Sequence, residues 1–154
     1  MYDTIVVGTD GSATAGAAVA HAISLASLTG AHLHVAMVTP SIPILVSPDM
    51  VVAAAEWSDA SELSTQATLE AAGELAADAG AEVSTHQLSG DPADALLALC
   101  EQLDADLLVV GSRGVHGARR FLLGSVSSRC AQHANRSILI VHPTSSTPTE
   151  EPPR

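Results

Sequence analysis

A chain of 154 residues that is 47% apolar has room for one compact domain with its own hydrophobic core. Its formal net charge of −11 argues against a general nucleic-acid or anionic-membrane binder, because phosphate groups repel such a surface. The chain has no lysine, and five of its six arginines lie between residues 113 and 136, so positive charge is concentrated in one stretch.

The first part of the sequence alternates between strand and helix patterns. An apolar run over residues 4–8 predicts a buried strand, and Ser12 is placed to cap a following helix that ends at Gly30. Residues 32–38 predict a second strand, and the prolines of the 39–55 connection indicate irregular structure. The inward face of the predicted first helix carries Ala15, Val19, Ile23 and Ala26.

A long helix is predicted from Glu56 to Ala79, where Gly80 ends it. Residues 82–88 alternate polar and apolar side chains, which is typical of an edge strand. The apolar row expected to face inward from this long helix comprises Ala60, Leu63, Ala67, Ala71 and Leu75.

A third helix begins with well-defined capping chemistry. Asp91 can accept from unpaired N–H groups, Pro92 suits the first helical position, and Asp94 favours the positive end of the helix. Its predicted inner face comprises Leu96, Leu99, Cys100 and Leu103. Both Cys100 and Cys130 lie in apolar helical patterns, so we expect buried, reduced thiols.

The last part of the domain predicts strand, helix and strand again. Residues 106–111 predict a strand, because the run LLVV that follows Asp106 is apolar, as a strand covered on both faces requires. A short helix is predicted over residues 125–134 and a final strand over 137–142. The domain is therefore placed at residues 1–143, and residues 144–154, with nothing to bury, are expected to form a disordered tail.

This alternation predicts an α/β fold, an open five-stranded parallel sheet with helices on both faces, of Rossmann-like type. Ligands of such sheets bind beyond the carboxyl ends of the strands, where the strand order reverses. Two segments compete for that place, residues 8–12 after the first strand and residues 111–114 after the fourth. If these strands are neighbours, Asp10 and Gly111 face each other across one crevice.

The residue types around this crevice suit a phosphate-bearing ligand. Gly111 and Gly114 allow close approach of backbone N–H groups, and Gly124 gives access to the start of a helix, where free N–H groups and the dipole attract anions. Asp10 suits ribose hydroxyls or a metal carried by the phosphates, although an aspartate here is also typical of a turn or helix cap. The helix start comprises Ser125, Val126 and Ser127.

Three motifs occur in order along the chain: VVGTDGS near the N-terminus, GDPADALL before ADLLVVGSRG, and Gly111-x-x-Gly114 followed after nine residues by Gly124-Ser125. Together they resemble the ATP-binding subgroup of the universal stress protein family, over residues 2–143. The resemblance implies strand order 3-2-1-4-5, an adenine pocket near Val38, and a homodimer formed through the last strand, residues 137–142.

The resemblance also implies the ligand and its contacts. The expected ligand is ATP, with Mg²⁺ or Mn²⁺ carried by its phosphates, bound by a cytoplasmic regulatory protein of the stress response. Asp10 and Gly111 would contact the ribose, while Gly114, Gly124 and Ser125 would hold the phosphates. The full set of expected contacts is Thr9, Asp10, Val38, Val110, Gly111, Ser112, Arg113, Gly114, Gly124, Ser125, Val126 and Ser127.

Two alternatives stay open at the same crevice: a slow ATPase or self-phosphorylating enzyme, and a protein that binds or sequesters cyclic AMP. No lysine is present to form a Walker-type loop, and no catalytic residue is assigned. His32 and His34 share one face of a strand, but nothing near them in sequence completes a metal site, so we assign them structural roles.

Overall fold

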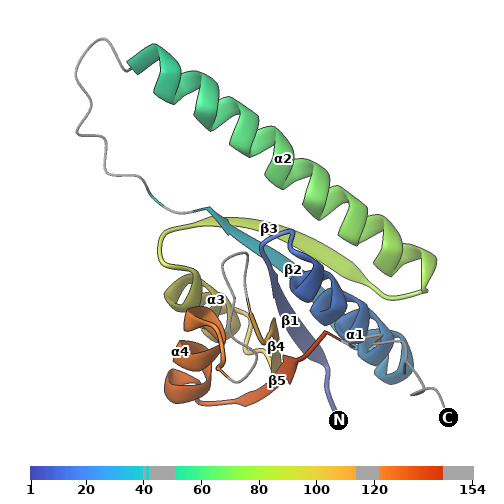
Figure 1. The fold of residues 1–154 in the computed structure, drawn as a ribbon. Coiled ribbons are helices and arrows are strands. Elements are labelled where there is room, and N and C mark those ends of the chain that lie inside the picture. The colour runs from blue at the N-terminus through green and yellow to red at the C-terminus, as the bar shows by residue number, and fades with distance from the viewer. Residues whose placement is uncertain (40, 42–50, 114–121, 144–154) are drawn as a thin grey trace, which may run out of the picture.

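The structure, a computed structural model, describes residues 1–39, 41, 51–113 and 122–143, with the backbone alone over residues 51–59. Its five strands form one sheet in the order β3-β2-β1-β4-β5, and every pairing is parallel (Figure 1). This is the predicted fold, with the strand order that the resemblance implied. The strands are β1 (Thr4–Thr9), β2 (His32–Thr39), β3 (Val83–Ser89), β4 (Leu107–Gly111) and β5 (Ser137–Val141).

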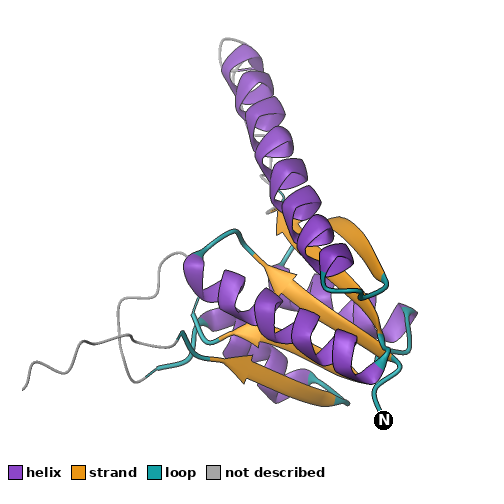
Figure 2. Ribbon diagram, turned by 90° about the vertical axis from the view of Figure 1, so that its right-hand side faces the viewer, coloured by secondary structure: helices purple, strands orange, loops and turns teal. Residues whose placement is uncertain are grey.

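Helices cover both faces of the sheet (Figures 1 and 2). One face packs against α1 (Ala13–Thr29) and α2 (Val51–Asp78), and the other against α3 (Pro92–Gln102) and α4 (Ser125–His133). Alternate residues of the central strand β1 pack on opposite faces of the sheet: Ile5 and Val7 pack in the α1/α2 core, and Val6 packs in the α3/α4 core. None of the helices in the described part of the chain is long and apolar enough to cross a membrane.

The predicted helix caps are confirmed. The Ser12 hydroxyl accepts a hydrogen bond from the Ala15 N–H (3.2 Å), and Gly30 ends α1 in the left-handed conformation, at φ +76°. At the start of α3, the Asp91 carboxylate accepts from the Asp94 N–H (3.1 Å). The Ser12 and Asp91 caps fix where α1 and α3 begin at the carboxyl edge of the sheet.

The predicted inward face of α2 is wrong. Ala60, Leu63, Ala67, Ala71 and Leu75 are all exposed, and the buried residues are Thr65, Leu69, Ala72 and Ala76. At about 100° per residue, the predicted row keeps to one face of the helix, but that face lies nearly opposite the buried residues. The buried residues follow steps of four, three and four, which keep to the side that faces the sheet. The helix also begins at Val51 rather than Glu56.

Candidate functional site

A pocket of about 170 Å³ opens where the carboxyl ends of β1, β2 and β4 meet the starts of α1, α3 and α4. We call it the strand-end pocket. It forms because β1 pairs with both β2 and β4. The loops that follow β1 and β4 turn toward opposite faces of the sheet, which leaves a crevice between these two strand ends. Its lining residues are Gly8, Thr9, Asp10, Ala15, Ala36, Val38, Pro92, Leu96, Val110, Gly111, Arg113, Gly124, Ser125, Val126 and Ser127.

The structure brings ten of the twelve expected contact residues together at this pocket. Of the other two, Gly114 lies outside the described residues. Ser112 is 1% exposed and does not line the pocket. The ten are Thr9, Asp10, Val38, Val110, Gly111, Arg113, Gly124, Ser125, Val126 and Ser127.

The β1–α1 loop is held by its own polar side chains. An Asp10 carboxylate oxygen accepts from the Ser12 N–H (2.9 Å), and the Thr9 hydroxyl accepts from the Gly11 N–H (3.2 Å). Gly11 itself has a φ of +78°, a conformation that favours glycine. Asp10 is therefore a turn residue, one of the alternatives raised by the sequence, and it also stands at the exposed rim of the pocket.

The start of α4 faces the pocket without a side-chain cap. Gly124 is the N-cap residue and has no side chain to accept a hydrogen bond, and no side chain among the described residues takes that role. The first N–H groups of a helix have no partner within the helix, and they carry the positive end of its dipole. With Arg113 also on the lining, this side of the pocket is electropositive.

Ser112 fastens this helix start to the sheet. Its carbonyl accepts from the Gly124 N–H (2.7 Å) and from the Ser127 hydroxyl (3.1 Å), while its own N–H donates to the Val141 carbonyl (2.8 Å). The Ser112 hydroxyl is buried and has no hydrogen-bond partner among the described residues. Ser112 therefore orders the site through its backbone, by joining β4, β5 and α4.

Gly111 has a packing role that the sequence did not reveal. A Cβ atom there would lie 3.0 Å from Cγ2 and 3.1 Å from the carbonyl oxygen of Thr14. The absent side chain thus lets β4 end directly against the first turn of α1. This contact brings the two chain exits together at the strand-end pocket.

Sequence reasoning missed the apolar floor and wall of the pocket. Gly8 and Ala36 pair in register on neighbouring strands, and a Cβ atom on Gly8 would lie 2.6 Å from Leu96 Cδ1. The alternation of side chains along a strand could have found them. Gly8 follows Val6 by two residues, and Ala36 precedes Val38 by two, so each points to the same α3/α4 face as its neighbour. The missed lining residues are Gly8, Ala15, Ala36, Pro92 and Leu96.

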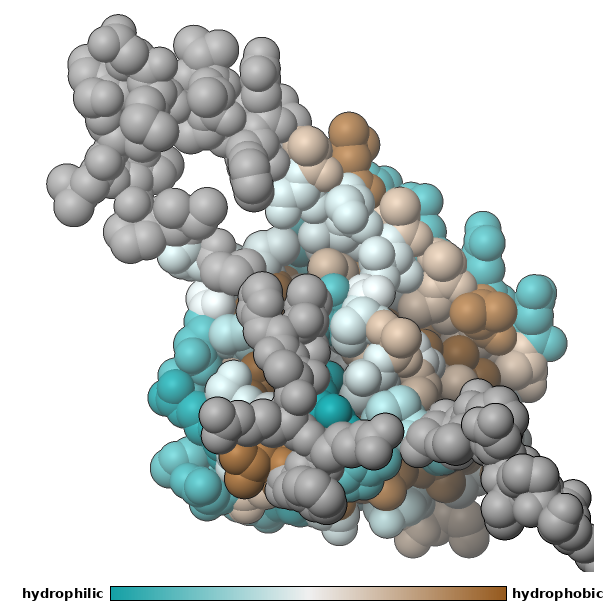
Figure 3. Space-filling model, in the orientation of Figure 1, coloured by the Kyte–Doolittle hydropathy of each residue, from teal (hydrophilic) through white to brown (hydrophobic). Residues whose placement is uncertain are grey.

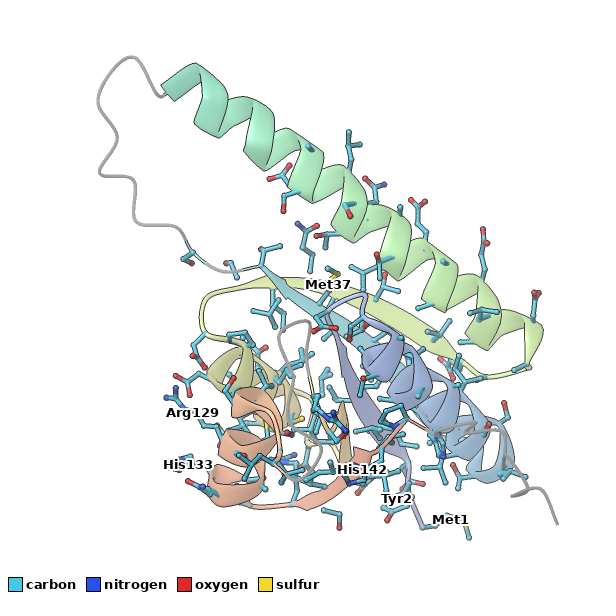
Figure 4. The ribbon with its side chains drawn as sticks, in the orientation of Figure 1. Met1, Tyr2, Met37, Arg129, His133 and His142 are labelled. Atoms are coloured by element: carbon cyan, nitrogen blue, oxygen red, sulfur yellow. The ribbon has the colours of Figure 1, made fainter. Side chains whose placement is uncertain are left out.

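An ion-pair cluster joins α4 to the start of α3. The Arg129 guanidinium lies 3.4 Å from a carboxylate oxygen of Asp91 and 3.0 Å from one of Asp94, and all three side chains are about half exposed. Figure 4 shows Arg129 on the outer side of α4, beside α3. Because Pro92 lines the pocket, this cluster connects two of its walls.

Residues 1–142 match the model of the Universal stress protein family. The chain belongs to this family. A universal stress protein of Mycobacterium tuberculosis is 36% identical over 149 residues, with 93% of this chain and 98% of the relative covered. The solved UspA from Lactobacillus plantarum has a TM-score of 0.82 at 24% identity, with 91% of this chain and 97% of that chain covered. Another solved universal stress protein, in complex with cAMP, is 34% identical with a TM-score of 0.71, covering 92% and 97%.

The two cysteines of this universal stress protein are buried and unbonded, as predicted. Cys100 on α3 and Cys130 on α4 have no exposed surface, and burial raises the pKa of each thiol to about 11. A thiol with so high a pKa is almost wholly protonated at neutral pH and is a poor nucleophile. Both cysteines belong to the α3/α4 core.

The predicted histidine pair is part of a larger cluster in the first half of β2. His34 Nδ1 lies 2.9 Å from His86 Nε2 on β3, and the His32 ring stacks on His34 with a centroid distance of 4.3 Å. Burial, followed by His32 and His86, lowers the pKa of His34 to about 4. Within the described residues no three His, Cys, Asp or Glu side chains are placed to hold a metal ion.

Proposed function

We propose that this universal stress protein binds an adenine nucleotide, ATP, in the strand-end pocket and acts as a regulatory nucleotide-binding module. One observation carries the proposal: the uncapped start of α4 opens onto the same pocket as an apolar slot between the sheet and α3. A flat base and an anionic phosphate chain are the two chemistries that this pairing suits.

The apolar slot suits the base. Ala36 and Val38 form its floor, and Pro92 and Leu96 form the wall on α3. Asp10 stands at the exposed rim of the pocket, where a carboxylate can accept from ribose hydroxyls. These residues support the proposal that adenine lies near Val38.

The electropositive side of the pocket suits the phosphates. The N–H groups at the start of α4 and the Ser125 hydroxyl are donors, and Arg113 adds a full positive charge. Local positive charge is needed, because the net charge of −11 would otherwise repel a polyanion. A bound Mg²⁺ or Mn²⁺ would neutralise part of the phosphate charge, and Asp10 is the rim residue suited to hold it.

A binding role fits these residues better than phosphoryl transfer. Transfer of a γ-phosphate relies on cations that clamp it and on a positioned base. Among the described residues of the lining, Arg113 is the one cationic side chain, and the chain has no lysine. We therefore place the protein among regulatory members of the stress response, with the nucleotide as signal rather than substrate.

Cyclic AMP is the second candidate ligand, because a solved relative that is 34% identical was determined in complex with cAMP. A single cyclised phosphate would use fewer of the donors at the α4 start than a triphosphate, so we expect ATP to bind more tightly. Calorimetric titration of the purified protein with each nucleotide tests this order. A cAMP affinity more than tenfold higher than that for ATP, about 1.4 kcal/mol, would overturn the choice of ATP.

Ser125→Asp tests the phosphate contact. An aspartate in the first turn favours the helix itself, so the fold should persist while the carboxylate repels the phosphates. We expect the ATP affinity to fall about tenfold or more, which is at least about 1.4 kcal/mol. Ala131→Asp adds the same charge at an exposed position further along α4 and is the matched control. Equal affinities of the two variants, or no ATP binding by the parent protein, contradict the proposal.

We also propose that two copies pair through β5. This strand lies at the edge of the sheet, with Ile138, Leu139 and Ile140 only partly buried, and an apolar edge strand is a ready surface for pairing. Sedimentation velocity should give twice the chain mass of 15.6 kDa. A species of 15.6 kDa across micromolar concentrations would exclude the dimer.

A further inference from the structure

A second hollow lies between α1 and α2, on the face of the sheet that α3 and α4 do not cover. We call it the helix groove. Its volume is about 670 Å³, and most of its lining side chains are small or aliphatic. The lining comprises Thr9, Gly11, Ser12, Gly16, Val19, Ala20, Ile23, Ser64, Ala67, Thr68, Ala71, Ala72 and Leu75.

The α2 wall of the groove carries the apolar row that the sequence predicted to face the sheet. Leu75 is 61% exposed, Ala67 and Ala71 are exposed, and Leu63, 69% exposed, continues the row beyond the groove. Leucines at this spacing are typical of a helix face that packs against another element. In the described part of this chain, that face has no packing partner of its own.

Acidic side chains border the same wall. Glu70, Glu74 and Asp78 each follow a groove residue by three positions, so they stand beside Ala67, Ala71 and Leu75 on the helix surface. All three are exposed, and none forms an ion pair with another described residue. In Figure 3 the surface over α1 and the adjoining side of α2 is pale or brown, while teal side chains stand along the outer edge of α2.

The α1 wall is neutral. No Asp, Glu, Lys or Arg occurs from Gly11 to Pro48, and the α1 residues of the groove are glycine, alanine and β-branched aliphatics with one capping serine. The groove therefore has a neutral apolar wall on one side and an acidic rim on the other. An occupant that complements it needs an apolar face and a row of positive charge beside that face.

We propose that the helix groove is the docking site for a cationic amphipathic helix of a partner protein. Both walls are helices, and their backbone N–H and C=O groups are already hydrogen-bonded within each helix. A partner therefore cannot add a strand here, but it can insert an amphipathic helix into the groove. Gly16 and Ala20 on α1, with Ala67 and Ala71 on α2, leave room for a third helix to approach closely. Lysines or arginines of the partner would then lie along Glu70, Glu74 and Asp78.

This inference is independent of nucleotide binding, because the groove is built from α1 and α2 and shares only Thr9 with the strand-end pocket. The probe is a synthetic helix of about five turns, with leucines on one face and lysines beside them, carrying a fluorescent label. An isomer with glutamate in place of lysine is its charge control. Fluorescence anisotropy with the whole protein measures binding of each probe.

Ala71→Trp should fill the groove and weaken binding of the lysine probe by about tenfold or more. Ala77→Trp places the same side chain on the exposed surface of α2 outside the lining, and it should leave binding unchanged. Glu74→Gln should weaken binding several-fold, whereas Glu101→Gln, an equal loss of charge on α3, should not. Circular dichroism and urea unfolding establish that each variant is folded.

The proposal fails if the two tryptophan variants bind the lysine probe equally, since attraction would then be a property of the acidic protein as a whole. It also fails if the glutamate isomer binds as well as the lysine probe. Finally, a change of sedimenting mass in Ala71→Trp relative to Ala77→Trp would assign the groove to a second copy of this chain, and would overturn the proposed partner.

Discussion

The strand-end pocket and the helix groove differ in what they are built from and in their charge. The pocket is formed by chain exits at the ends of strands, and its polar side consists of backbone N–H groups with Arg113. The groove is formed by side chains on two helices and is bordered by carboxylates. An acidic chain can thus offer an anion site, because its described arginines all lie on the α3/α4 side of the sheet.

Each described arginine has a distinct role on that side. Arg113 lines the pocket, Arg129 pairs with the start of α3, and Arg136 donates to the carbonyls of Cys100 and Ala105 at the other end of α3. All three belong to the α3/α4 side. The α2 surface, in contrast, carries carboxylates without a neighbouring cation among the described residues.

The largest expected effect compares the packing of the two faces. Leu108→Ala, at a fully buried position of β4 on the α3/α4 face, should destabilise the protein by about 3–5 kcal/mol. Leu69→Ala, on α2, should cost about 2 kcal/mol, because the groove beside α2 allows the helix to settle into the space. Urea unfolding measures both. Equal costs would mean that the α2 layer is packed as firmly as the α3/α4 layer.

The next effect is a loss of stability in acid. The pKa of His34 is lowered from 6.5 to about 4, so the folded state holds fewer protons than the unfolded state between these values. The contribution of His34 to the free energy of unfolding is therefore fully present above pH 6.5. It is lost as the pH drops toward 4, by up to about 3 kcal/mol at 1.36 kcal/mol per pKa unit. His32, His86 and Glu82 surround this group and shape the transition.

His34→Leu isolates that contribution. The variant should lose a large part of the slope of unfolding free energy against pH between about 6.5 and 4, and the part that remains is due to His86, whose pKa is also lowered by burial. His21→Gln, at an exposed position of α1, is the control and should keep the slope. An unchanged slope in His34→Leu would show that another group governs the acid transition.

The smallest effect concerns the link between the pocket walls. Arg129→Gln removes ion pairs that are about half exposed, and such pairs contribute about 0–1 kcal/mol. We expect a loss of stability within that range, and smaller in high salt because mobile ions screen the pairs. Thermal unfolding at two salt concentrations checks it. A loss of several kcal/mol would indicate that the cluster governs how α4 sits against α3.

Much of the fold was predictable because its signals are local. Ser12 and Asp91 each cap a helix through the N–H three positions ahead, and the apolar run before Gly111 predicts a strand covered on both faces. The face of α2 was not predictable in this way, because alanines occur all around the helix and give no clear stripe. Thr65, a polar residue, is buried there, while Leu63 is not.

The pocket was predictable where its chemistry is carried by motifs, and less so where it depends on packing. Asp10, Gly124 and Ser125 were expected at the site and line it. Leu96 was expected only as a core residue, because its contact with Gly8 depends on how α3 crosses the sheet. Ser112 does not line the pocket, and its backbone joins the elements around the site, which the motif gave no means to predict.

The close approach of Leu96 to Gly8 has a consequence for how this pocket can diversify. A methyl group at position 8 would meet the end of the leucine at 2.6 Å, so the leucine would have to rotate or be replaced by a shorter residue. Change at one position is therefore tied to change at the other. A larger residue at position 8 together with a smaller one at position 96 would reshape the floor of the strand-end pocket without altering the loops around its mouth.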